Sequence, residues 1–340
     1  MTKLTLFLLT LLFLIGNVMT QDLDVSKVGI TAAPFLEIGV GARAIGMGGA
    51  VVANANDASA LYWNPAGIAG AKNMQFLAMH TNWIADMEFN YAGFTFPLGA
   101  LGTMGASITV LNYGNMNVRT IDQPEGTGEI FNALDLSAGL SYARSLTDRF
   151  SIGFNAKFIH QSIWHESAQG FAVDFGTLFV TGLNGLRIGA SLLNFGTDMR
   201  MEGKDVLVFY DVDPGALGNN DRVPANLQTE DWPLPLTFQF GLAMDVIKND
   251  MNIVTLAVDA VHPYDNTESI NLGAEYGFRK TLFLRAGYRD LMLRDGEQGV
   301  TFGIGFSNRF LDNFSIQLDY AYADFGRLDN AQHLSLSVTY

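Results

Sequence analysis

The 340-residue sequence contains no cysteine, and it is short of positive charge. Without cysteine the chain can have no disulfide, no thiolate metal site and no lipidated cysteine of the lipoprotein kind. Its 20 Lys and Arg residues stand against 34 Asp and Glu residues, which gives a formal net charge of −14. That acidity argues against nucleic acid or anionic lipid as a partner. Whatever anchors this protein must be its own surface.

The sequence also lacks any long hydrophobic run after residue 16. Met1 to Lys3 precede an apolar run at 4–16, and Thr20 is a small residue ahead of a plausible cleavage point. This is the layout of a secretory signal peptide. The run is short for a membrane-spanning helix, which needs about 20 apolar residues. We therefore predict that residues 1–20 are a signal peptide and that the chain is exported without a helical anchor.

Motifs that carry catalysis are missing as well. The sequence has no Gly-Lys-Ser/Thr phosphate loop and no Gly-x-Ser-x-Gly nucleophile elbow. The glycines at 39–49 fit only a loosened dinucleotide fingerprint, without a βαβ unit around it. The histidines lack the spacing of a zinc site, so we expect no enzyme, no metal centre and no cofactor. These histidines are His80, His160, His165, His262 and His333.

One acidic stretch, in the segment 196–233, is a candidate for ion binding. Asp211, Asp213 and Asp221 offer the hard oxygen ligands that calcium prefers. Their spacing is not that of an EF-hand, and acidic residues are common in surface loops. An ion-binding loop and an ordinary acidic loop therefore both stay open.

What the sequence has in place of these motifs is alternation. In residues 134–142 leucine, alanine and tyrosine occupy one face, whereas aspartate, serine and glycine occupy the other. A period of two is typical of β-strands with two different faces. Many of the segments run to about ten residues or more, the length of a tilted transmembrane strand. Fourteen strands are predicted, at 74–84, 87–97, 100–112, 131–144, 149–162, 168–181, 186–195, 234–247, 251–261, 268–279, 282–290, 299–308, 313–324 and 331–340.

The connections between these strands are unequal. Those after even-numbered strands are tight, as at 98–99, whereas those after odd-numbered strands are mostly long, as at 113–130 and 196–233. Only the first hairpin breaks the rule. Short periplasmic turns and long outer loops are typical of outer-membrane barrels. We therefore predict an all-β fold, a transmembrane antiparallel β-barrel of about 14 strands at 74–340, in the outer membrane of a Gram-negative bacterium with both termini periplasmic.

Large aromatic residues mostly fall near the ends of the predicted strands. Rings at the level of the lipid headgroups form girdles around such barrels. Packing under the loops is the alternative, and we favour the girdle. The residues concerned are Trp83, Tyr91, Tyr113, Trp164, Trp232, Tyr264, Tyr288 and Tyr322.

The chain ends in an alternating strand with a terminal aromatic residue. Leu336, Val338 and Tyr340 alternate with serine and threonine. This pattern resembles the C-terminal signal by which barrel-assembly machinery recognises its outer-membrane clients. We therefore expect that machinery to be a partner of this chain.

Residues 21–73 do not alternate. They are rich in glycine, and Asp57 is placed to cap a short helix through Trp63 that Pro65 would end. A compact, irregular segment ahead of a barrel is suited to fill its lumen. We predict an N-terminal plug at 21–73, between the signal peptide and the barrel.

The same segment resembles a known family. The stretch Gly-Val-Gly-Ala-Arg-Ala-Ile-Gly-Met-Gly-Gly-Ala at 39–50 and the Asn-Pro-Ala-Gly box at 64–67 resemble the start of the PorV/PorQ outer-membrane proteins of the Bacteroidetes. These are similar in turn to the FadL/TodX transporters, whose barrels have fourteen strands and an N-terminal plug. With the strand pattern, the resemblance covers nearly all of the mature chain. The residues of the plug motif are Gly39, Gly41, Arg43, Gly46, Gly48, Gly49, Asp57, Asn64, Pro65 and Gly67.

What the resemblance implies about function is divided. A PorV-like protein is a component of type IX protein secretion that binds a translocon or exported cargo proteins. A FadL-like protein is a channel for hydrophobic small molecules, with an apolar lumenal pocket beside the plug. A structural barrel that organises the envelope is a third hypothesis. No cargo-binding residue can be matched, so the first function rests on family analogy. Outer-membrane lipid is a partner in every case.

Overall fold

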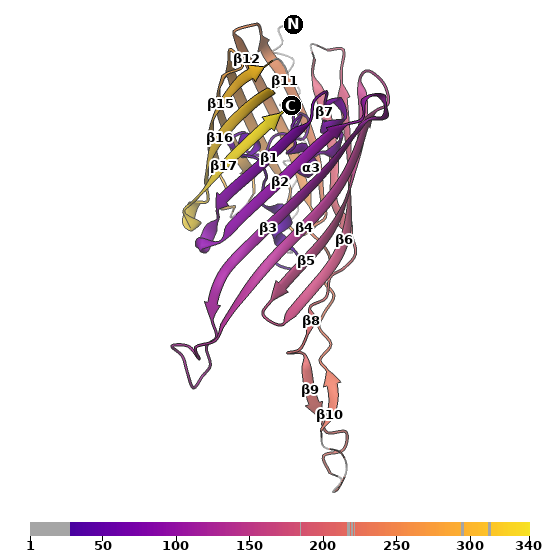
Figure 1. The fold of residues 1–340 in the computed structure, drawn as a ribbon, viewed down its shortest axis with the longest axis vertical. Coiled ribbons are helices and arrows are strands. Elements are labelled where there is room, and N and C mark those ends of the chain that lie inside the picture. Colours follow the sequence, from indigo (N-terminus) through magenta and orange to yellow (C-terminus); the bar gives the residue numbers. More distant parts are fainter. Residues whose placement is uncertain are drawn as a thin grey trace.

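The computed structural model describes residues 28–183, 185–215, 218, 220, 222–293, 296–311 and 314–340. Fourteen antiparallel strands form one closed ring (Figure 1), which confirms the barrel predicted from alternation. The predicted signal peptide, 1–20, lies outside the described residues. The strands of the ring are β1 (Gln75–Asn82), β2 (Glu88–Pro97), β3 (Thr103–Asn117), β4 (Ile130–Ser145), β5 (Phe150–Ile163), β6 (Glu166–Val180), β7 (Arg187–Gly196), β11 (Thr237–Lys248), β12 (Asn252–Pro263), β13 (Ser269–Phe278), β14 (Leu282–Leu291), β15 (Val300–Leu311), β16 (Phe314–Asp324) and β17 (Asn330–Thr339).

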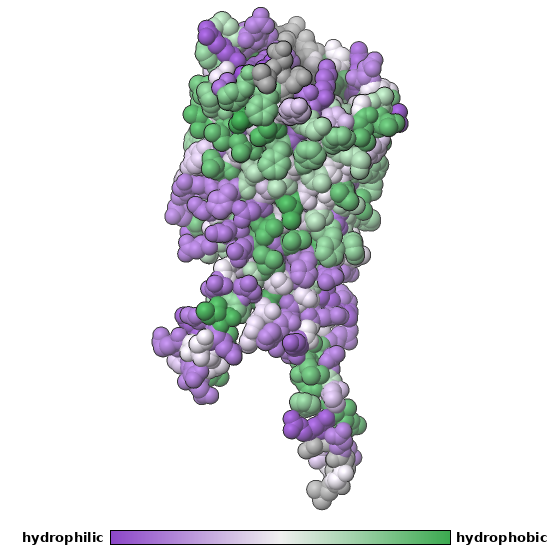
Figure 2. Space-filling model, viewed as in Figure 1, coloured by the Kyte–Doolittle hydropathy of each residue, from purple (hydrophilic) through white to green (hydrophobic). Residues whose placement is uncertain are grey.

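Alternation along each strand decides which residues face the lumen. On β4, Asp135 and Ser141 point inward and are each 3% exposed, whereas Leu140 points outward and is 67% exposed. Polar residues inside and apolar residues outside is the arrangement of a membrane barrel with a filled or watery lumen. Figure 2 shows apolar residues gathered on the wall and hydrophilic residues toward the projecting loops.

The ring closes because the first strand pairs with the last. Gln75 of β1 lies opposite Thr339 of β17 in an antiparallel register. Just beyond them, Met74 and Tyr340 exchange two backbone hydrogen bonds of 2.9 Å. Closure leaves the wall without a strand edge, which lipid could not hydrogen-bond.

The two ends of the ring differ as the sequence predicts. The connections at one end, called the short-turn end, hold a few residues each, as at 146–149 and 279–281. At the opposite, long-loop end, the connections 118–129 and 197–236 project well beyond the strands (Figure 1). The start of β1 and the end of β17 both lie at the short-turn end.

The longest connection has more structure than the plain loop predicted for it. It contains β8 (Glu202–Gly203), which pairs with β6, and a hairpin of β9 (Leu207–Tyr210) and β10 (Val223–Asn226). Pro224 within β10 conceals this strand in the sequence, because proline interrupts a ladder. A two-stranded ribbon has free edges, where proline is tolerated.

Residues 28–73, called the inner segment below, lie inside the ring. The predicted helix ending at Trp63 is present, but its N-cap is Ser59. Asp57 accepts a hydrogen bond from the Ser59 N–H at 2.8 Å instead of capping the helix itself. None of the described helices is long and apolar enough to cross a membrane. The inner segment contains η1 (Pro34–Glu37), α2 (Ala42–Gly46), α3 (Ala60–Trp63) and η2 (Pro65–Gly70), and the connections contain η3 (Ile84–Asp86), η4 (Gly99–Leu101) and η5 (Gly326–Leu328).

Replacing Leu140 by arginine tests the outward orientation of the alternating face. We expect Leu140→Arg to lower the free energy of unfolding from lipid vesicles by about 2–4 kcal/mol, because a charge near the middle of the apolar wall must leave water. Urea titration followed by tryptophan fluorescence measures this. Ile121→Arg is the control, since Ile121 lies fully exposed in the connection 118–129. Equal stability of the two variants would contradict a lipid-facing Leu140.

Candidate functional site

The inner segment crosses the ring from the long-loop end to the short-turn end. At the long-loop end the N–H of Ala32 donates to the carbonyl of Pro233 at 2.8 Å, and the hydroxyl of Thr31 donates to Asp265 at 2.8 Å. Between the two ends, α2 packs on β14 to β17 and η2 packs on β3 to β6. The segment therefore touches opposite sides of the wall.

Glycines on the inner face of the wall allow the inner segment to come close. A Cβ on Gly153 of β5 would stand 2.3 Å from the carbonyl carbon of Pro65, and one on Gly287 of β14 would stand 2.2 Å from the amide nitrogen of Gly48. A larger residue at these positions would push the backbone of the inner segment away from the backbone of the wall. The wall glycines with an inner-segment atom within 3.2 Å of such a Cβ are Gly105, Gly153, Gly176, Gly189, Gly241, Gly273, Gly287 and Gly303.

The box at 64–67 is the firmest part of this contact. The buried amide of Asn64 donates to the carbonyl oxygens of Val52 at 2.8 Å and Thr177 at 3.0 Å. Its side-chain oxygen accepts from the N–H of Ala66 at 3.1 Å. One side chain thus joins two turns of the inner segment to β6. Buried amides that are fully hydrogen-bonded in this way fix a single arrangement.

The motif glycines pack against neighbours and form no nucleotide loop. Gly48 has a φ of 64°, and a Cβ there would meet the carbonyl oxygen of Leu272 on β13 at 2.7 Å. The ring of Trp63 packs against Gly39 and Gly49. The motif glycines at which a Cβ would meet another atom within 3.3 Å are Gly39, Gly41, Gly46, Gly48, Gly49 and Gly67.

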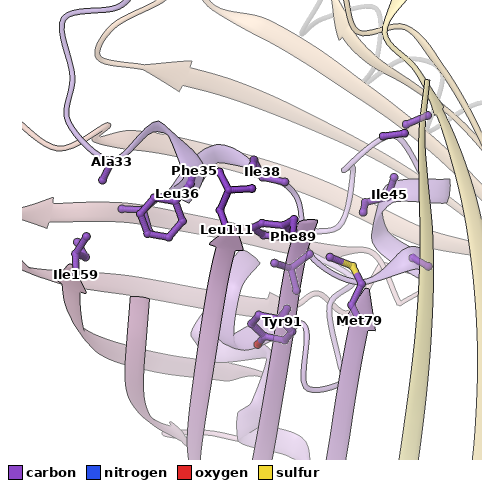
Figure 3. Packing of buried hydrophobic residues seen from close by; sticks show 14 of the residues in the cluster. Ala33, Phe35, Leu36, Ile38, Ile45, Met79, Phe89, Tyr91, Leu111 and Ile159 are labelled. Carbon is purple, nitrogen blue, oxygen red and sulfur yellow. The ribbon is translucent and has the colours of Figure 1, made fainter. Parts of the chain in front are cut away.

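Apolar side chains fill the space on one side of the inner segment. Figure 3 shows Phe35 and Ile45 of the inner segment with Phe89 and Tyr91 of β2 in one buried cluster. Phe35 and Phe89 have almost no exposed surface. This packing holds the segment by burial of apolar area, in addition to its hydrogen bonds.

A buried charge cluster ties the inner segment to the wall. Arg43 contacts Glu275 of β13 at 3.0 Å and Asp57 of its own segment at 3.2 Å. Arg285 of β14, which is fully buried, contacts the same Glu275 and Asp319 of β16 at 2.7 Å each. Burial acts to lower the pKa of Arg43, but Glu275 and Asp57 raise it above its usual range, so it stays charged. Loss of one partner from such a cluster costs about 3–5 kcal/mol, because a charge is left uncompensated.

Sequence reasoning found part of this cluster. It singled out Arg43 and Asp57 within the motif but missed Glu275, Arg285 and Asp319. Each missed residue is a charge at an inward position of an alternating strand, which is the signal that could have found it.

A cavity of about 490 Å³ remains at the long-loop end of the lumen. Glu37 and Tyr62 of the inner segment line one side. Asp265, Arg289 and Asp290 line the other. Burial and the carboxylates of Asp265 and Asp290 raise the pKa of Glu37 to about 7, although Arg289 acts in the opposite direction.

His80 and His333 are neighbours across the pairing of β1 with β17, but His80 is exposed and His333 is buried. His333 is buried and shares a hydrogen bond of 2.8 Å with the hydroxyl of Thr81, whereas His80 contacts Asn90 at 2.8 Å. Within the described residues, no group of three or more histidines and carboxylates could hold a metal ion.

The candidate ion-binding loop is described only in part. Asp211 accepts from the N–H of Asp213 at 3.0 Å, and Asp213 accepts from the N–H of Gly215 at 3.2 Å. Asp221 lies outside the described residues. The ion site therefore stays a prediction.

The aromatic girdle was predicted too broadly. Tyr91 and Tyr113 face the lumen, where their hydroxyls donate to the carbonyl of Ala58 and to Asp135. Trp83 packs edge-on against Phe325. Nearness to a strand end does not decide which face a side chain occupies. The large exposed surfaces of the following members remain compatible with a girdle: Trp164, Trp232, Tyr264 and Tyr288.

The C-terminal residues lie at the seam of the ring. Leu336 and Tyr340 have large exposed surfaces, and Val338 of β17 lies opposite Phe76 of β1. Their recognition by assembly machinery stays a prediction.

A closed fourteen-stranded ring with an apolar outer face is an outer-membrane β-barrel. The same fold is present in the Ralstonia pickettii toluene transporter TbuX, at 13% identity, with 89% of this chain and 97% of that chain covered and a TM-score of 0.54. The Pseudomonas putida toluene transporter TodX is similar at 14% identity, 88% and 97% coverage and a TM-score of 0.55. A Pseudomonas aeruginosa FadL homologue is similar at 13% identity, 86% and 96% coverage and a TM-score of 0.50. These likenesses show the fold.

The family model described as type IX secretion system protein PorV matches residues 21–188, which include the inner segment and strands β1 to β6. No curated protein matches the sequence. The chain belongs to the PorV family of outer-membrane barrels, as the motif at 39–67 predicted.

Replacing Gly153 by alanine tests the close contact of the inner segment with the wall. We expect Gly153→Ala to destabilise the protein by about 1–3 kcal/mol and to expose the inner segment to protease, because the new Cβ would overlap the Pro65 carbonyl. Limited proteolysis and urea unfolding measure both effects. Gly70→Ala is the matched control, since a Cβ there meets nothing within 4 Å. Wild-type behaviour of Gly153→Ala would contradict the packing described.

Proposed function

We propose that this barrel binds protein partners in type IX secretion, either the translocon or exported cargo. The observation that carries the proposal is the match of the PorV family model to residues 21–188. That range includes the inner segment, whose motif residues make the wall contacts described above.

The filled lumen supports a binding role over a conducting one. The inner segment packs through η2 on β3 to β6 and through α2 on β14 to β17, so it bridges opposite sides of the wall. The cavity of about 490 Å³ is far too small for a protein chain with any tertiary structure. An exported protein would therefore be held at the long-loop end and would not pass through this ring.

The longest connection offers a surface for such a partner. Leu207 and Phe209 of β9 and the nearby Val212 are more than half exposed. Exposed apolar residues on a ribbon with free edges are typical of sites that add a partner strand or pack against one. The connection 197–236 also holds eight acidic and three basic residues, which favours a basic partner.

We also propose the orientation of the barrel. Long loops of outer-membrane barrels face the cell surface and short turns face the periplasm. This places Tyr340 in the periplasm, where assembly machinery would read Leu336, Val338 and Tyr340 as its signal. The periplasmic N-terminus stays a prediction, because residues 1–27 lie outside the described residues.

A channel for hydrophobic small molecules is the second candidate function. It is favoured by the cavity beside the inner segment, at the position where such a ligand would be held. The carboxylates of Glu37, Asp265 and Asp290 in that cavity disfavour a purely apolar ligand, because a hydrocarbon would desolvate them without a bond in return. The third hypothesis, a structural envelope barrel, would leave the exposed ribbon without a partner.

Removing the hairpin tests the proposed function. The N–H of Leu227 donates to the carbonyl of Val206 at 2.8 Å, so residues 207–226 can be replaced by an Asn-Gly turn without disturbing the ring. We expect this variant to fold but to lose co-purification of translocon components or of cargo with a type IX C-terminal signal, measured by mass spectrometry after mild detergent extraction.

The matched control shortens the other projecting loop. The N–H of Thr127 donates to the carbonyl of Val118 at 2.8 Å, so residues 119–126 can be removed in the same way. This variant should keep its partners. Absence of translocon and cargo from the wild-type preparation, in a host that has the system, would overturn the proposal.

A further inference from the structure

The cavity at the long-loop end, called the acidic cavity below, has more negative than positive charge. Three carboxylates line it, from Glu37, Asp265 and Asp290, against one guanidinium, from Arg289. Asp265 accepts a hydrogen bond from Thr31 at 2.8 Å. The three carboxylates, the Arg289 guanidinium and the Tyr62 hydroxyl are the titratable groups that line the cavity.

Internal contacts leave this charge poorly compensated. Arg289 donates to the backbone carbonyl of Glu37 at 3.4 Å, and its Nε lies 4.0 Å from Asp290. The Glu37 carboxylate accepts no hydrogen bond within the described residues. Asp290 accepts one from the hydroxyl of Ser269 at 3.1 Å. A positively charged ligand would therefore compensate the negative charge of the cavity.

A second observation points to a ligand independently of the carboxylates. Gln239 of β11 is an inward residue of the wall, lines the acidic cavity and is only 8% exposed. Its side-chain oxygen accepts no hydrogen bond within the described part of the chain. A buried amide oxygen without a donor costs about 1–3 kcal/mol, which a ligand N–H would recover.

The remaining lining suits an aliphatic stem. Leu36 and Leu193 line the cavity beside the aromatic rings of Tyr62 and Trp63, which meet edge to face at 4.9 Å. Aromatic faces attract cations, and apolar side chains cover methylene groups. A volume of about 490 Å³ holds a small organic molecule and greatly exceeds a bare metal ion.

We propose that the acidic cavity binds an organic cation, an ammonium or guanidinium group on a short aliphatic stem, that enters from the long-loop end. Glu37 and its neighbouring carboxylates receive the charge, and the Gln239 oxygen accepts one of its hydrogens. The group comes either from a free amine or from a Lys or Arg side chain of a bound protein. The second source rests on the proposed function.

The direction of the pH dependence follows from Glu37. Its pKa is raised to about 7, so it is largely neutral at pH 5.5 and ionised at pH 8. A bound cation favours the ionised form, and affinity must therefore rise with pH across this window. Asp265, Asp290 and Arg289 face Glu37 across the cavity and set its charge balance.

Isothermal titration calorimetry on the full-length protein in detergent tests the proposal. The probes are 1-aminopentane for a free amine and N-acetyl-lysine amide for a peptide side chain, with N-acetyl-norleucine amide as the uncharged control. We expect at least one amine to bind, about thirtyfold more tightly at pH 8 than at pH 5.5, because the ionised fraction of one carboxyl with a pKa of about 7 rises by about that factor. The norleucine compound should not bind.

Matched variants locate the binding. Glu37→Gln should weaken amine binding at least tenfold and remove its pH dependence. Glu268→Gln should bind as the wild type, because Glu268 is an exposed rim carboxylate paired with His262 outside the cavity. The hairpin deletion 207–226 should also bind amines normally, so failure of this proposal and of the secretion role can be told apart.

Three results would overturn the proposal: no binding of either amine, equal binding of the norleucine compound, or tighter binding of calcium ions than of both amines. Heat-modifiable gel mobility shows whether Glu37→Gln folds. If the folded variant binds amines as the wild type does, the proposal is also overturned.

Discussion

Direct contact between the inner segment and glycines of the wall is the constraint on which the rest of the structure depends. At Gly153 and Gly287 the backbone of the inner segment lies so close to the wall that no side chain fits between them. Close packing already restricts the position of the segment. The hydrogen bonds of Asn64 and the ion pairs of Arg43 then fix its orientation. The contacts of η2 with β3 to β6 and of α2 with β14 to β17 lie on opposite sides of the ring, so the wall holds the segment between them.

This constraint divides the lumen into two environments. Around α2 and η2 the space is packed, and the charges of Glu275, Arg285 and Asp319 are paired. Toward the long loops the packing ends, and the carboxylates of the acidic cavity face open space with one guanidinium among them. We expect a barrel built in this way to conduct poorly. It presents both the acidic cavity and an exposed ribbon at its long-loop end, which suits a binding protein.

The sequence predicted the wall well and the lumen poorly, for physical reasons. Alternation as at 134–142 identifies strands because the two faces of the wall meet different media, and all fourteen strands were found. Arg285 and Asp319 are 34 positions apart, and alternation carries no information about which inward charges meet. Tyr91 and Tyr113 were assigned to a girdle from their place along the strand, although their parity places them inside.

The motif residues fall between these cases. Resemblance singled out Asn64, Arg43 and the glycines at 39–49 as a set, but their roles as wall contacts required the partners. Gly153 and its counterparts on the wall counted only as small residues of an inner face. The hairpin at 207–226 was hidden by Pro224 and by the acidic character of the connection around it.

Conductance in a planar lipid bilayer tests the closed lumen most directly. The wild-type protein should insert and remain electrically silent at moderate voltage, because the inner segment bridges the lumen from β3–β6 to β14–β17. A steady open-channel current from a population shown to be folded would contradict this and would make the barrel a conduit.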